Sequence, residues 1–355
     1  MKKDFKSFLK LAIKNLITLV LIVAFIIVFS AIFGSENQLI GVGLVTGLMM
    51  FYSVDLGLNK KQAPFIILGI CMLMAISNIV SIYNIYLAIV FNIFTIYIFM
   101  TLSTVHLMYK TYMPFILMYI FAEGMPIEQN QITKRVLAFI LSGVILTLVY
   151  CIKHRKLQNG KTVKDIYKDI SLSKETTIFN IKMTLGITIA MFLTEFFNIE
   201  KGMWISITVM SLTQPHFSMT KERIKHRFLG TVIGVVCFFI LFGGLIPSEF
   251  FGIIVAILSY IYTFMKSYWI QIIFVTINSL NAANGVFNTS YKAGAYRVSF
   301  IFLGILISLF IVFLEKMLDR KVKEYPSDEE EIQENKEQNI LSNKQEVLTN
   351  GDEVC

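Results

Sequence analysis

Long apolar runs separated by short polar loops are the main pattern of this chain. About twelve runs can be marked, each near the roughly 20 residues that a helix needs to cross about 30 Å of hydrocarbon. They begin near Leu16, Leu39, Pro64, Ile85, Tyr109, Val136, Ile178, Met203, Phe228, Phe250, Trp269 and Val298. The pattern predicts an all-α integral membrane protein with about 12 transmembrane helices. The fifth and eleventh runs are interrupted by Met113-Pro114 and by several asparagines, so ten or eleven spans are the alternatives.

The runs recur in the same order in two parts of the chain. The matching positions are Lys60 with Lys221, Leu68-Gly69 with Leu229-Gly230, and Arg135-Val136 with Arg297-Val298. Because six is an even number, two such parts would have the same orientation, as in transporters built from parallel repeats. The hydropathy therefore predicts two six-helix halves.

Loop composition divides the chain into four regions. Residues 1–152 form the first six-span membrane half, and residues 177–318 form the second. Residues 153–176 are a basic cytoplasmic linker, with a short amphipathic helix expected around Val163 to Ile170, and residues 319–355 are a polar cytoplasmic tail. Gly160-Lys161-Thr162 resembles the end of a phosphate-binding loop, but Arg155 stands where the leading glycine belongs, so an ATPase is not expected.

Composition and charge support a membrane location. The chain is 55% hydrophobic and 16% charged, which is too apolar for a soluble protein of this size. Its net charge of +8 comes from cations between the apolar runs, which favours a topological role over nucleic-acid binding. Most of these cations fall on one side if both termini are cytoplasmic, and the exceptions are Lys134, Arg135, Lys292 and Arg297. We therefore expect a multi-pass protein of the plasma membrane.

Sequence motifs for catalysis were not found. The chain has no HExxH and no Gly-x-Ser-x-Gly, its four histidines show no ligand spacing, and its four cysteines form no CxxC pair. The sequence thus predicts no enzyme activity, no metal site and no cofactor.

The segment from Ile207 to Gly234 interrupts the apolar pattern. Pro215 cannot continue a helix and biases Gln214 away from helical geometry, so the eighth span should end there. Ser218 or Thr220 would cap the next helix, whose first turns carry four cations: Lys221, Arg223, Lys225 and Arg227. Cations at a helix N-terminus oppose the helix dipole. Two interpretations remain open: lipid phosphates and topology account for the cations, or the segment binds an anion.

The same segment carries a spaced pattern of tryptophan, threonines, Gln-Pro, a basic stretch and Arg-x-x-Gly-Thr-x-x-Gly. The residues are Trp204, Thr208, Gln214, Pro215, Arg227, Gly230, Thr231 and Gly234. This pattern resembles the fusaric acid resistance (FUSC) family, which includes aromatic carboxylic acid exporters. The first half departs from it, since no Gln-Pro and no Gly-Thr pair surround Gly69. The resemblance implies export of organic anions.

The expected roles of these residues follow from the resemblance and from their chemistry. Arg227 would clamp a carboxylate because a guanidinium binds such groups bidentately, and Lys221 and Arg223 would attract the anion. Trp204 would stack on an aromatic substrate or serve as an interfacial anchor. Glu195, near the outer end of the seventh span, is the candidate for proton coupling.

The remaining residues of the pattern have open or structural roles. Thr208, Gln214 and Thr231 would line the pathway, although Thr208 could instead bond its own backbone. Gly230 and Gly234 share a helical face and would let a neighbouring helix approach closely.

Together these features predict a secondary transporter that exports aromatic or other organic acid anions. The alternatives are a passive organic-anion channel and a non-transporting membrane scaffold or envelope factor. The expected partners are a small organic anion and anionic lipids, with a homodimer as an option and no nucleic acid.

Overall fold

The computed structural model describes residues 2–155, 160–171, 174–245, 247–284 and 290–324. In these residues the regular secondary structure is helical, apart from an isolated bridge between Leu58 and Lys161. The chain forms two compact units, Met1–Ser308 and Leu309–Cys355. The predicted tail from residue 325 onward lies outside the described residues, so the structure says nothing of it.

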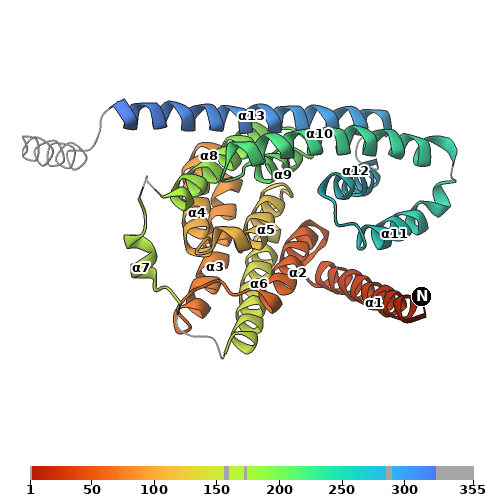
Figure 1. Ribbon diagram of the computed structural model, residues 1–355, viewed down its shortest axis with the longest axis horizontal. Coiled ribbons are helices and arrows are strands. Elements are labelled where there is room, and N and C mark those ends of the chain that lie inside the picture. The colour runs from red at the N-terminus through yellow and green to blue at the C-terminus, as the bar shows by residue number, and fades with distance from the viewer. Residues whose placement is uncertain (1, 156–159, 172–173, 246, 285–289, 325–355) are drawn as a thin grey trace, which may run out of the picture. The chain divides into compact units, whose positions relative to one another are not determined.

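Figure 1 follows six longer helices before a short linker helix and six after it. The first group is α1 (Lys2–Phe33), α2 (Gln38–Ser53), α3 (Ala63–Tyr83), α4 (Ile85–Ser103), α5 (Met113–Glu123) and α6 (Ile132–Lys153). The linker helix is α7 (Val163–Lys168), in the place where an amphipathic helix was expected. The second group is α8 (Glu175–Phe196), α9 (Met203–Leu212), α10 (Phe217–Ile240), α11 (Phe251–Tyr262), α12 (Tyr268–Asn284) and α13 (Ser290–Glu324).

Local sequence explains where several helices begin. Proline stands in the first turn of α3 and of α5, where its fixed backbone angle suits a helix start and its missing N–H is not needed. Asn84 caps α4, because its side-chain oxygen accepts from the backbone N–H of Tyr86 and Leu87 at 2.9 and 3.1 Å. Gly34 separates α1 from α2 with a φ of 94°, a conformation that other residues rarely adopt.

Membrane spans are indicated for part of these helices. Among the described residues, seven segments are long and apolar enough to cross a bilayer: 9–33, 63–83, 85–103, 129–153, 175–196, 217–243 and 292–317. The apolar helices α5, α9 and α11 have 11, 10 and 12 residues, about 15 to 18 Å of helix. They are therefore shorter than the hydrocarbon layer, and the expected count of about twelve spans stays a prediction.

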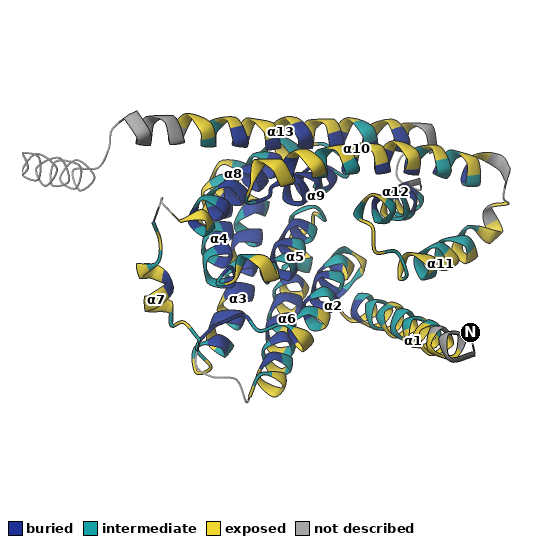
Figure 2. Cartoon of the chain, in the orientation of Figure 1, coloured by how far each residue is buried: buried dark blue, intermediate teal, exposed yellow. Residues whose placement is uncertain are grey.

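Burial separates an inner set of helices from a peripheral one, as Figure 2 shows. In the first group, α2 packs on α5 and α6, and α3 packs on α4 and α6. The contact of α4 with α8 joins the two groups, and α9 packs between α5 and α8. By contrast α1 exposes most of its large apolar side chains, among them Leu16 and Ile27, and α11 fully buries no residue and exposes Ile253 and Ile257. In a membrane protein such faces are solvated by lipid.

Arg135, on α6, is completely buried in the first group of helices. Its Nη1 donates to Asn78 Oδ1 (3.1 Å) and to the carbonyl of Ala122 (2.6 Å). Its Nη2 donates to the carbonyls of Glu36 (3.2 Å) and Met125 (2.7 Å). One guanidinium thus joins the loop after α1, the end of α5 and the loop that precedes α6.

The linker is held to the loop between α2 and α3. Asn59 donates its backbone N–H to the carbonyl of Lys161 (2.8 Å), and Lys161 donates to the carbonyl of Gly57 (2.9 Å). A Cβ at Gly160 would lie 2.2 Å from the Gly57 carbonyl oxygen, so only glycine fits this approach. The glycine of the phosphate-loop-like tripeptide therefore has a packing role.

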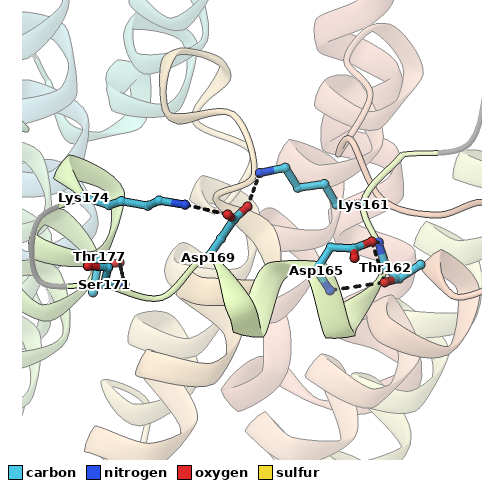
Figure 3. A network of polar contacts seen from close by, with 7 residues as sticks. All are labelled: Lys161, Thr162, Asp165, Asp169, Ser171, Lys174 and Thr177. Carbon is cyan, nitrogen blue, oxygen red and sulfur yellow. Dashed lines mark hydrogen bonds and ion pairs between the residues drawn. The ribbon is translucent and has the colours of Figure 1, made fainter.

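A small ionic network connects the two ends of the linker between the helix groups (Figure 3). Asp169 accepts from the ammonium groups of Lys161 and Lys174, each at 2.5 Å. These hydrogen bonds lower the pKa of Asp169 to about 2, so its carboxylate stays ionised at neutral pH. Thr162 and Asp165 form a capping box at the start of α7.

Candidate functional site

The break after α9 is made by Gln214 and Pro215. Helix α9 ends at Leu212, and the Gln214 amide donates to the carbonyls of Ser211 (3.1 Å) and Thr213 (2.8 Å). Gln214 is buried, so its amide completes the C-terminus of α9. The predicted cap of the next helix was wrong: α10 begins at Phe217 after His216, which forms no side-chain cap. Ser218 and Thr220 lie inside the helix instead.

This break lies deep between the helices. Lys182 on α8 is buried and donates its ammonium group to the carbonyl of Pro215 at 2.9 Å. Lys182 stands seven residues after the start of α8, which corresponds to about 10 Å along that helix. Since α8 is one of the candidate spans, the end of α9 falls about two turns inside it.

Arg227 reaches the middle of α9 from α10. Its side chain is only 4% exposed, and its Nη2 donates a long hydrogen bond of 3.4 Å to Thr208 Oγ1. Thr208 in turn donates to the carbonyl of Trp204 at 2.7 Å, the backbone bond that the sequence left open for it. The Nε of Arg227 is buried and has no hydrogen-bond partner. A guanidinium in this state retains the capacity to bind an anion.

Arg297 reaches the same helix from α13. Its side chain is 2% exposed, and its guanidinium carbon lies 4.5 Å from the centre of the Trp204 ring. Trp204 is itself buried and has Phe300 at 6.3 Å in an edge contact. The structure thus buries Trp204 among the helices, beneath the guanidinium of Arg297.

Four cations from three other helices therefore contact α9 and the residues just after it, at positions about one helical turn apart. They are Arg297 at Trp204, Arg227 at Thr208, Arg223 at Ser211 and Lys182 at Pro215. Within the described residues, neither Arg227 nor Arg297 forms an ion pair with a carboxylate. By insertion scales, a charge at the centre of a membrane costs about 2.5 to 3.5 kcal/mol, so such residues mark functional sites by default.

The two outer basic residues of the predicted site differ in burial. Arg223 is half-buried, donates to the Ser211 carbonyl at 3.4 Å, and lies with its guanidinium carbon 4.6 Å from the centre of the Tyr268 ring. Lys221 is exposed. Arg223 thus belongs to the row of cations along α9, whereas Lys221 lies on the surface of α10.

The small residues of α10 bring α12 close. A Cβ at Gly230 would lie 2.7 Å from the Trp269 carbonyl oxygen, and a Cβ at Gly234 would lie 2.8 Å from the Cβ of Thr276. Thr231, between them, is buried and its Oγ1 has no hydrogen-bond partner. The hydroxyl of Thr231 is therefore a further unsatisfied polar group, one turn beyond Arg227.

The coupling candidate Glu195 is exposed near the end of α8. A second carboxylate, Glu123 at the end of α5, is half-buried and accepts from the Asn78 amide at 2.9 Å. The same Asn78 accepts from Arg135, so Glu123 belongs to a polar cluster of the first helix group. The structure does not place Glu123 or Glu195 in the row of cations along α9.

Sequence reasoning missed Arg297 and Lys182 as members of this site. Arg297 was counted as a topological exception, and its match to Arg135 in the internal repeat was the signal that set it apart. Lys182 lies in an apolar run whose other residues gave no reason to choose it. Among the described residues, no three histidine, cysteine or acidic side chains gather as a metal site requires.

The apolar helices and the buried row of cations define a multi-pass, all-helical membrane protein. Residues 189–311 match the sequence model of a family described as fusaric acid resistance protein-like. The resemblance to the FUSC family is thereby confirmed for this segment, which runs from α8 into α13 and contains Trp204, Arg227 and Arg297.

Two curated proteins are similar to parts of the chain. One is an uncharacterized protein of Haemophilus influenzae, 33% identical over 67 residues, which make up 19% of this chain and 9% of that protein. The other is the uncharacterized protein ORF2 of Neisseria gonorrhoeae, 26% identical over 136 residues, or 36% of this chain and 31% of that protein. The similarity thus spans less than a third of either relative. No solved structure matches the chain.

Proposed function

We propose that this protein is a secondary transporter that exports organic acid anions, aromatic acids among them, across the plasma membrane. The observation that carries the proposal is Arg227, a guanidinium buried between membrane helices with an unsatisfied Nε and no carboxylate partner in the described residues. A positive charge in that position is costly unless an anion offsets it during the transport cycle. The similarity of residues 189–311 to the FUSC family supports the same class of substrate.

In this proposal the two six-helix groups form parallel halves, with both termini in the cytoplasm. The anion enters from the cytoplasm between α8 and α10, where Lys182 and Arg223 lie, and then reaches Arg227. Helix α9 ends about two turns from the N-terminal end of α8. In the proposal, the entrance to the pathway is therefore lined by the side chains that follow α9 and is not blocked by a further turn of that helix. Glu195 remains the proposed coupling group, and anionic lipids would solvate the basic start of α10.

The test is uptake of labelled benzoate into inside-out vesicles at matched protein abundance. We expect Arg227→Gln to reduce the initial rate at least tenfold, because the carboxylate loses its bidentate partner. The matched control is Lys225→Gln, which removes the same charge from an exposed position of the same helix and should leave the rate within about twofold.

The pH gradient separates the mechanisms. Uptake that depends on the gradient supports a coupled carrier. Uptake that follows the benzoate gradient linearly and ignores pH supports a passive channel. If wild type and Arg227→Gln transport equally, Arg227 is not part of the pathway. If neither moves any of a panel of organic acids, the result supports the scaffold alternative.

A further inference from the structure

Two guanidinium groups meet one face of α9. Trp204 and Thr208 are four residues apart, so their side chains lie one above the other on the same side of the helix. Arg297 covers the Trp204 ring and Arg227 donates to Thr208. The two guanidinium groups thus approach the same face of α9 about one turn apart, and both are buried.

Three donor nitrogens of this pair have no acceptor in the described part of the protein. The Nε of Arg227, and both Nε and Nη1 of Arg297, are buried without a hydrogen-bond partner. The nearby Thr231 Oγ1 is in the same state. A buried N–H of a charged group that lacks an acceptor costs more free energy than that of a neutral group. Several such groups at one place indicate a ligand that supplies the acceptors.

The first half of the chain provides the comparison. Arg135 occupies the position that matches Arg297 in the repeat pattern of the sequence. It is buried to the same degree, and its Nε, like those of Arg227 and Arg297, has no hydrogen-bond partner. Both of its terminal nitrogens, however, are satisfied by four hydrogen bonds to protein oxygens. The difference therefore lies in the terminal nitrogen Nη1, which has two protein acceptors in Arg135 and none in Arg297, whose guanidinium lies on an aromatic ring.

We propose that Arg297 and Arg227 together form a binding site for the carboxylate group of an organic acid, and that Trp204 positions Arg297 in this site. The inference rests on the proposed function for its substrate class, and it adds a second binding residue and a role for the tryptophan. The cation–π contact fixes the Arg297 plane without consuming its N–H groups, so those groups remain available to the ligand. The substrate's own ring system is therefore not stacked on the face of Trp204 that Arg297 covers.

A carboxylate fits these donors better than a halide does. Its two oxygens carry about four acceptor positions in one plane, which can serve N–H groups from two planar guanidinium forks at once. A halide is a single sphere and gains no such geometric match. One carboxylate would also neutralise part of the repulsion between the two arginines, so binding and charge compensation are coupled.

The chain offers a direct optical reporter, because Trp204 and Trp269 are its two tryptophans. In the Trp269→Phe background, the fluorescence of Trp204 reports on the site itself. The purified protein in detergent is titrated with cyclohexanecarboxylate, which does not absorb in the tryptophan range, and with chloride at equal ionic strength. We expect a saturable change with the carboxylate, and a Kd for chloride at least tenfold weaker.

Variants locate the binding site. In the same background, Arg297→Gln and Arg227→Gln should each weaken carboxylate binding at least tenfold. Lys292→Gln removes an exposed cation from the same helix as Arg297 and should leave the Kd within about twofold. An unchanged Kd in Arg297→Gln overturns the proposal, and equal affinity for chloride overturns the carboxylate assignment.

The role of Trp204 needs a readout other than its own fluorescence. A ligand that binds the folded state raises its melting temperature, and the size of the shift reports the affinity. Trp204→Phe retains an aromatic face under Arg297 and should keep most of the shift caused by cyclohexanecarboxylate, whereas Trp204→Leu should lose it. Equal shifts in the two variants would show that the ring only fills space.

The binding and transport measurements can refute the carboxylate site and the transport function separately. Carboxylate binding that depends on Arg297, without benzoate uptake in vesicles, sustains the site and overturns the transporter. Uptake that is intact in Arg297→Gln sustains the transporter and overturns the two-arginine site. If Arg297→Gln does not give folded protein, Arg297→Lys keeps the charge but not the fork, and the proposal requires it to bind at least about fivefold more weakly.

Discussion

Buried arginines occur in both halves of the chain, and their surroundings differ. Arg135 donates to three backbone carbonyls and Asn78, and so joins segments that are distant in sequence. Arg297 contacts an aromatic ring and has Nε and Nη1 unsatisfied. The same residue type thus stabilises the fold in one place and, in our proposal, serves a ligand in the other. These two roles have opposite consequences for stability.

We expect Arg135→Gln to lower the free energy of unfolding by about 2 to 4 kcal/mol, because hydrogen bonds to a charged group contribute about 1.5 to 3 kcal/mol each and glutamine restores only part of them. Arg297→Gln should leave stability unchanged or raise it, since it removes a buried charge that the protein does not compensate. Apparent melting temperatures in detergent, without carboxylate present, measure both. An equal loss in the two variants would contradict the assignment of Arg297 to a ligand.

At the scale of elements, close helix packing distinguishes the two halves. The glycines of α10 allow the backbone of α12 to approach, while Gly69 of α3, which matches Gly230 in the repeat pattern, has no atom within 4 Å of the position its Cβ would take. Matching positions therefore carry the same residue for different local reasons. Alanine substitutions at the two glycines therefore separate two effects on stability: the loss of the close contact between α10 and α12, and the intrinsic cost of glycine within a helix.

Gly230→Ala should destabilise the protein by about 1 to 3 kcal/mol, because its Cβ would meet a backbone oxygen that cannot rotate away. Gly69→Ala should be neutral or stabilising by about 0.5 to 1 kcal/mol, the usual gain from replacing glycine within a helix. Thermal unfolding of the two variants in the same detergent gives the comparison. Similar losses would mean that α10 and α12 are not in close contact at this point.

At the scale of the whole molecule, hydrogen bonds between loops hold the ends of different helices together. The loop after α2 bonds to the linker after α6, and Arg135 gathers carbonyls from the loop after α1 and the segment after α5. Burial, together with the positive charge of Arg223 on α10, lowers the pKa of Lys110, which follows α4. The loop after α2 thus meets the linker after α6, whereas the loop after α1 meets the segment after α5.

Orientation can be measured with single cysteines in a background without the four native ones. Lys164→Cys lies on the exposed side of the linker, and Glu200→Cys lies in the exposed turn between α8 and α9. With both termini cytoplasmic, an impermeant thiol reagent should label Glu200→Cys in intact cells and should label Lys164→Cys only after permeabilisation. Labelling of both positions in intact cells would refute the alternating topology.

Several features of the fold and site are determined by the sequence alone. The apolar runs identify a membrane protein because a helix with an apolar surface satisfies its own backbone hydrogen bonds in hydrocarbon. Gln214-Pro215 predicts the end of α9 because proline lacks the N–H that a helix needs. The row of basic residues on α10 and the likeness to the FUSC family can be seen in the same way. These signals are local, since each depends on neighbouring residues of one segment.

The partners of the buried cations were decided by the tertiary structure. Lys182, Arg227 and Arg297 belong to three helices, and their meeting along α9 depends on how closely those helices pack. The sequence does indicate that Arg135 and Arg297 are related, but it does not indicate that one has four protein acceptors and the other has an aromatic ring. Hydrogen bonding and charge compensation depend on atoms that are distant along the chain, and so only the folded arrangement separates the structural arginine from the one available to a ligand.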